Sequence, residues 1–123
     1  MSGVLLWFGV AVVGGLAALL RWQVDTRVVG ALQRRGLPVG TFAVNLTAAA
    51  LLGLIAGLAL TGDALLLLGT ALVGTYSTFS TWMLETERLA EDGRLRAGAG
   101  NIALSLLAGV ACAAMGRLIG AHL

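Results

Sequence analysis

The chain has 123 residues, of which 59% are hydrophobic and 11% charged, and its mean hydropathy is +0.95. Charged residues make up about a quarter of ordinary soluble domains, so this composition excludes a water-soluble enzyme. The net charge of +2 is too small and too dispersed to indicate a nucleic-acid partner, and 18 glycines beside one proline are typical of helices packed in lipid.

Four apolar stretches are long enough for spanning helices, which need about 20 residues each. They predict membrane spans at about 4–22, 39–60, 64–84 and 97–119. The charged stretch 23–38 is expected to be a connector that could be partly helical along the membrane surface, and 85–96 a charged loop. The sequence therefore predicts an all-α protein of the cell membrane, with one four-span domain covering 1–123.

Polar side chains form a stripe in the second span and another in the fourth. Thr41 and Asn45 lie four residues apart and so share a helix face, and Asn101 and Ser105 have the same spacing. In hydrocarbon such side chains either bond neighbouring helices or line a pathway. The two stripes could face each other, or they could face a shared path.

The third span carries the strongest anomaly. Its residues 74–82 include five Ser or Thr hydroxyls in nine positions. Hydroxyls can satisfy backbone groups released by a break, so this run predicts a helix interrupted near mid-membrane. Carbonyls exposed at such a break are potential cation ligands, and exposed amides are potential anion ligands. The alternative is a hydroxyl-rich contact between two helices.

Two aromatic residues share a face beside this predicted break, because Phe79 and Trp82 are three positions apart. The edge of an aromatic ring is positive, so a ring held edge-on to a path can attract an anion weakly. Weak binding suits a pore, because the ion must leave as well as enter. Plain packing is the alternative interpretation.

The spans lack a deeply placed acidic residue, since Glu85 and Glu87 stand at the end of the third span. A proton-coupled carrier of cationic drugs needs such an acid, so the sequence disfavours a small multidrug transporter. Arg21 and Arg117 lie near span ends, where we expect them to reach the interface or hold helix ends rather than contact an ion.

Three motifs together resemble the CrcB or Fluc family of fluoride channels. They are the double glycine and arginine–aromatic pair within 14–22, the Gly-Thr-Phe-Ala-Val-Asn sequence at 40–45, and the glycine- and hydroxyl-rich stretch 69–82. They occur in the family's order along nearly the whole chain. The departures from the family pattern are Ala17, Thr75, Ser77 and Trp82.

The resemblance implies an antiparallel dimer with two fluoride pathways and a central sodium ion. By position, the backbone carbonyls of Gly74 and Ser77 would bind sodium. The implied fluoride path consists of Asn45, Phe79, Trp82, Thr41, Thr81 and Ser105. The expected function is passive fluoride export from the cytoplasm, which reduces fluoride toxicity and needs no catalytic residue. A non-conducting partner subunit is a further alternative.

The arginines predict the orientation of the chain. With four spans, the loops after the first and third lie on one side of the membrane, together with seven of the eight arginines: Arg21, Arg27, Arg34, Arg35, Arg88, Arg94 and Arg96. Only Arg117 lies on the other side, with both termini. Basic loops stay cytoplasmic, so the termini are predicted outside. This bias favours a dimer with an oppositely oriented homologue over a homodimer.

Overall fold

The computed structural model describes residues 1–32 and 37–123, and the elements found there are helices. Within these residues, four helical stretches are long and apolar enough to cross a membrane: Gly3–Leu32, Val39–Gly57, Gly62–Glu91 and Leu95–Ala121. The prediction of an all-α, multi-pass membrane protein is confirmed.

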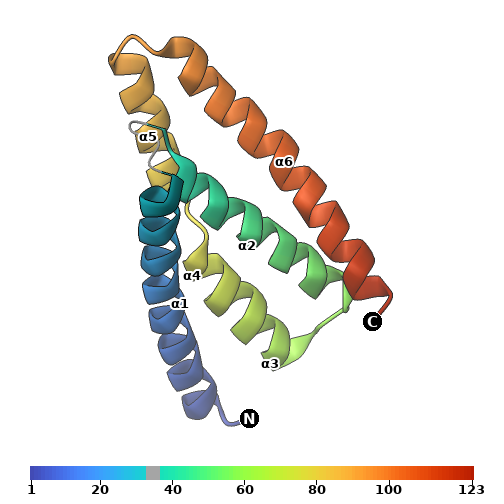
Figure 1. Cartoon of the computed structure of the whole chain (residues 1–123). Helices are drawn as coiled ribbons and strands as arrows, with labels where there is room; N and C mark the ends of the chain where they lie inside the picture. Colours follow the sequence, from blue (N-terminus) through green and yellow to red (C-terminus); the bar gives the residue numbers. More distant parts are fainter. Residues whose placement is uncertain (33–36) are drawn as a thin grey trace.

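The first, second and fourth stretches are single helices, and the third is composite (Figure 1). The elements are α1 (Gly3–Leu32), α2 (Val39–Gly57), α3 (Gly62–Leu65), η1 (Leu66–Val73), α4 (Gly74–Tyr76), α5 (Ser80–Glu91) and α6 (Leu95–Ala121). Segment η1 is a π-helix, a wide-turned form that often occurs near functional sites. It leads directly into α4.

Two helices extend further than the sequence analysis expected. Helix α1 continues to Leu32, ten residues past the expected end of the first span, and its 30 residues measure about 45 Å. Helix α5 likewise continues to Glu91, which leaves a short turn at Gly93 with φ 76°. Charged residues end the hydrocarbon part of a span but need not end the helix. The expected connector residues 33–36 lie outside the described residues.

Helices α2 and α6 pack closely, and glycines make this possible. Gly53 and Gly57 on α2 meet Gly116 and Gly120 on α6, each pair spaced by four. A side chain at Gly53 would run into the backbone of Ala113. This arrangement of small residues lets two helix backbones approach each other in a membrane.

The buried core joins α1, α2 and the third span through Ala17, Val44, Ala48, Ile55, Val73 and Tyr76. The Tyr76 hydroxyl also lies 2.7 Å from Thr47 Oγ1 on α2. Since Tyr76 is the last residue of α4, this contact holds the end of α4 against the middle of α2. The next residues of the third span therefore lie beside the polar stripe of α2.

Candidate ion-binding site

Between α4 and α5 the chain leaves helical geometry, because the Ser77 backbone is extended, with φ −74° and ψ 164°. The Thr78 amide donates to Asn45 Oδ1 at 2.9 Å, so it does not donate to the Gly74 carbonyl. The Thr81 amide donates to Thr78 Oγ1 at 3.3 Å, so it does not donate to the Ser77 carbonyl. Both predicted sodium ligands thus lack their helical donors. Placement of this interruption near mid-membrane stays a prediction.

Asn45 pairs with both polar groups of one residue in the interruption. Its Nδ2 donates to the Thr78 carbonyl at 2.8 Å, while its Oδ1 accepts from the Thr78 amide. An unpaired backbone group in hydrocarbon costs several kcal/mol, so this double contact supports the non-helical backbone. An amide Nδ2 carries two N–H groups, so the bond to the Thr78 carbonyl uses one of them.

Arg21 reaches the same segment from α1. Its Nη1 donates to the Ser77 carbonyl at 3.3 Å. We expected Arg21 to reach the interface or hold a helix end, but the structure places its guanidinium on one of the two predicted sodium ligands. The Ser77 oxygen has a second lone pair, which this contact leaves for another donor or a cation.

Thr41 makes its hydrogen bond outside the predicted polar stripe. Its Oγ1 donates to Glu85 Oε1 at 2.7 Å, which joins α2 to α5. Thr41 is buried and Glu85 is half-buried. Across the start of α2, a side chain at Gly40 would collide with the carboxylate of Asp25, so glycine lets α1 approach α2 closely here.

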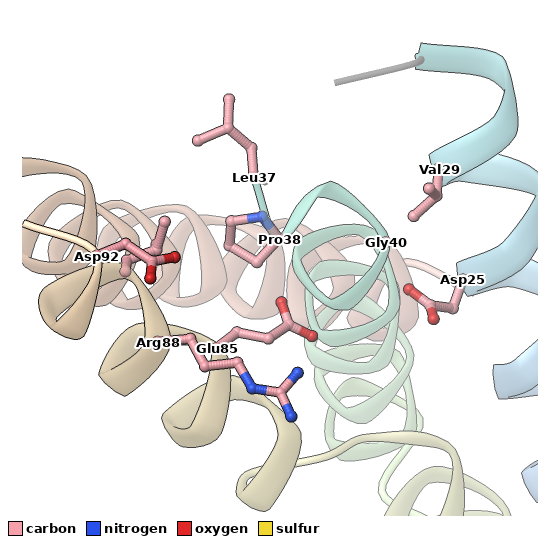
Figure 2. A pocket seen from close by; sticks show the side chains of 9 residues that line it. Asp25, Val29, Leu37, Pro38, Gly40, Glu85, Arg88 and Asp92 are labelled. Carbon is pink, nitrogen blue, oxygen red and sulfur yellow. The ribbon is translucent and has the colours of Figure 1, made fainter. Parts of the chain in front are cut away.

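Two polar cavities adjoin this contact and share Asp25 as a wall. The smaller, of about 170 Å³, is lined by Arg21, Thr41, Thr78 and Thr81 among others. The larger, of about 330 Å³, has the lining residues drawn in Figure 2, where Asp25 and Glu85 reach toward the start of α2 from opposite sides. The smaller cavity, which Thr78 lines, adjoins the interruption.

The aromatic pair lies at the start of α5. The rings of Phe79 and Trp82 are 5.7 Å apart between centroids and meet edge to face at 75°, as expected for residues sharing a face. Phe79 is 69% exposed on this chain. Its ring is therefore free to contact a second subunit or a path between subunits.

Asn101, in the polar stripe of α6, bonds to α5 rather than to the stripe of α2. Asn101 Nδ2 donates to Thr86 Oγ1 at 2.9 Å, while Asn45 is occupied at the interruption. Ser105 Oγ is buried and has no hydrogen-bond partner among the described residues. The structure thus brings Asn45, Thr41 and Thr81 together beside the interruption, and Ser105 is not among the residues that line the cavity there.

Sequence reasoning missed Asp25 and Glu85, which line the larger cavity. Asp25 belongs to a stretch that we expected to be a connector, and Glu85 was regarded only as a residue at the end of the third span. The signal that could have found them is helical spacing. Glu85 lies three residues after Trp82 and so continues the face of the aromatic pair, and Asp25 lies four after Arg21 on one face of the first span.

These features define a multi-pass membrane protein whose third span carries a polar, non-helical segment supported by side chains from neighbouring spans. Residues 8–117 match the family model described as CrcB-like protein, Camphor Resistance (CrcB). The chain belongs to the CrcB family.

Curated relatives cover almost the whole chain. "Fluoride-specific ion channel FluC 2" of Mycolicibacterium paratuberculosis is 52% identical over 120 residues, 95% of each chain. The protein of the same name from Mycobacterium bovis is 51% identical over 116 residues, 94% of this chain and 91% of that one. "Fluoride-specific ion channel FluC 1" of Frankia casuarinae is 42% identical over 122 residues, 92% and 94% of the two chains. The family consists of channels rather than enzymes, which disfavours the multidrug-transporter alternative.

Proposed function

We propose that the chain is a passive fluoride channel that lets the anion leave the cytoplasm. The observation that carries this proposal is the Asn45 contact, which supports the interruption at Thr78, a residue that also lines a cavity with Arg21, Thr41 and Thr81. Fluoride is small and strongly hydrated, so a path must offer hydrogen-bond donors to replace its water. The names of relatives at 51–52% identity agree with this function.

In this proposal the path combines strong and weak contacts. Asn45 and Thr81 offer donors beside the interruption, and Ser105 offers a hydroxyl further along α6. Thr41 also belongs to the proposed path, with its hydroxyl proton donated to Glu85. Phe79 and Trp82 offer ring edges or an indole N–H. No lysine occurs in the sequence, so the path holds no ammonium that would trap the anion.

Fluoride efflux from liposomes containing the purified protein tests the function. We expect efflux that a fluoride electrode detects and that chloride-loaded liposomes do not reproduce. Protein-free liposomes are the control. If neither the chain alone nor the chain reconstituted with an oppositely oriented homologue gives efflux, the proposed function is wrong.

We further propose an antiparallel dimer in which this chain keeps both termini outside and pairs with an oppositely oriented homologue. Seven arginines lie on the predicted cytoplasmic side and one on the other, whereas a chain inserting in both orientations should have nearly balanced numbers. Relatives with names numbered 1 and 2 are compatible with such pairs.

Labelling of single cysteines measures this orientation. In a Cys112→Ala background, we expect Ser2→Cys to react with an impermeant maleimide on intact cells, and Glu91→Cys to react only after permeabilisation. The two positions serve as matched controls on opposite sides. Similar labelling of both from outside, together with efflux by the chain alone, would instead establish a homodimer with both orientations.

We also propose that the released carbonyls of Gly74 and Ser77 bind a structural sodium ion, with further ligands from the second subunit. Among the described residues no group of His, Cys, Asp and Glu could hold a metal, and neutral carbonyls favour a monovalent cation over a divalent one. The ion would neutralise the carbonyl dipoles where the two interruptions meet.

Removal of sodium tests this site. We expect efflux to be lost when N-methyl-D-glucamine replaces sodium during purification and reconstitution, and to return when sodium is restored. Ser77→Ala should keep both activity and sodium dependence, since the ligand is a backbone oxygen. Full activity after exhaustive sodium removal would exclude the site.

A further inference from the structure

Helix α2 contacts the third span on both sides of the interruption. Before the interruption, the Tyr76 hydroxyl lies 2.7 Å from Thr47 Oγ1. After it, the Asn45 side chain pairs with the amide and the carbonyl of Thr78. The two contacts are two residues apart on each helix and follow opposite orders along the chain. Ser77, the residue between them, is the one with the extended backbone.

The direction of the Tyr76 bond follows from the other contacts of Thr47. A threonine hydroxyl has one proton. Thr47 Oγ1 lies 2.9 Å from the Ala43 carbonyl and 3.0 Å from the Val44 carbonyl of its own helix. Both carbonyls can only accept, so the Thr47 proton is directed toward them. The Tyr76 O–H is therefore the donor to Thr47, and this donor belongs to a buried side chain that is 4% exposed.

The Tyr76 bond acts on the backbone that carries both proposed sodium ligands. Tyr76 ends α4, which begins at Gly74, and the Ser77 carbonyl comes directly after it. The Ser77 amide still donates to the Val73 carbonyl at 3.0 Å, so the helical pattern of bonds stops at this residue. Contacts that fix the chain at Tyr76 and again at Thr78 restrict the torsions of Ser77. They thereby restrict the direction of its carbonyl.

We propose that Tyr76 is a positioning residue that keeps the Ser77 carbonyl oriented for sodium before the ion binds. This inference rests on the proposed function and on its sodium site. A backbone whose carbonyls lack helical donors gains hydrogen bonds by returning to a helix, so the sodium-free segment needs a restraint. A site that adopts its binding conformation only part of the time binds with an affinity reduced by that fraction. Loss of the Tyr76 hydroxyl should therefore weaken sodium binding although no ligand is removed.

Sodium titration of Tyr76→Phe tests this role. The phenyl ring fills the same buried space and Thr47 keeps its acceptors, so we expect the variant to fold. With N-methyl-D-glucamine as the balancing cation, the sodium concentration that gives a set rise in the thermal unfolding midpoint should increase about 2–10-fold, the effect of one hydrogen bond. Efflux at saturating sodium should be unchanged. Thr47→Val should match Tyr76→Phe, and the double variant should be no weaker.

A spectroscopic signal from Tyr76 gives a second measurement. Tyr76 is the one tyrosine in the sequence, so fluorotyrosine labelling gives a single ring resonance in fluorine NMR. We expect sodium to shift this resonance. In Thr47→Val it should be broad without sodium and should narrow when sodium is added. Thr26→Val is the matched control, since its hydroxyl also bonds a carbonyl of its own helix but has no contact with the third span.

The outcomes separate this role from the proposed function. Unchanged sodium affinity in Tyr76→Phe and Thr47→Val, with normal efflux, would overturn the positioning role and leave the channel function standing. Efflux reduced equally at every sodium concentration would also overturn it, because that pattern indicates packing alone. A ring resonance that sodium does not affect would have the same meaning. If the chain gives no efflux but both variants weaken sodium binding, the positioning role is supported and the function is not.

Discussion

We expect Asn45→Ala to reduce fluoride efflux by about 5–150-fold, which corresponds to the loss of about 1–3 kcal/mol of ion stabilisation. The substitution removes the N–H that the proposed path offers to the ion. It also leaves the Thr78 amide and carbonyl without the partner that they have at 2.9 and 2.8 Å. Efflux from liposomes at equal protein content measures the effect.

Asn45→Asp keeps one of the two contacts with Thr78. Aspartate keeps an oxygen that can accept from the Thr78 amide but removes both N–H groups and adds a negative charge that repels an anion. We expect this variant to lose efflux as fully as Asn45→Ala. Thr26→Val is a matched control, because the Thr26 hydroxyl bonds only its own helix at Trp22. Efflux near the unsubstituted level in folded Asn45→Asp would remove Asn45 from the path.

The largest effect on folding is expected at the contact between α2 and α6. A Cβ at Gly116 would run into the Ala50 carbonyl and lie 2.9 Å from the Leu54 nitrogen, both of which are backbone atoms. Backbone cannot move aside as a side chain can, so Gly116→Leu must force the helices apart. Overpacking of this kind typically costs about 1–3 kcal/mol, and occasionally more.

We therefore expect Gly116→Leu to lower the midpoint of thermal unfolding in detergent and to produce aggregate on size exclusion. Gly109→Ala is the matched control, because a Cβ at this position of the same helix has no neighbour within 4 Å. It should leave the midpoint unchanged or raise it slightly, since alanine favours helix over glycine. Equal behaviour of the two variants would contradict the glycine-mediated contact.

The sequence predicted what depends on local composition. Apolar runs predicted the spans, and the hydroxyl-rich run around Ser77 pointed to the segment where the backbone leaves helical geometry. Helix ends were predicted less well, because α1 and α5 continue through charged residues that mark the edge of the apolar stretch only. Helical geometry tolerates those residues, so composition alone could not place the ends.

Contacts between helices were beyond sequence reasoning. Arg21 and Ser77 are 56 residues apart, and Thr41 and Glu85 are 44 apart. Each pairing depends on how the spans are rotated about their axes, and the helix spacing of one span does not determine the rotation of another. For the same reason, the sequence did not show that the glycine pair of α2 packs against the glycine pair of α6, although each pair is visible in the sequence.

The double contact of Asn45 with Thr78 has a consequence for assembly. The described groups that hold the interruption, from Asn45, Arg21 and Thr78 itself, belong to one chain. A single inserted chain can therefore hold its non-helical segment in place before it meets another. Association then joins two preorganised surfaces and loses little additional conformational entropy. Partner choice becomes a matter of surface fit and membrane orientation, decided after each chain has folded.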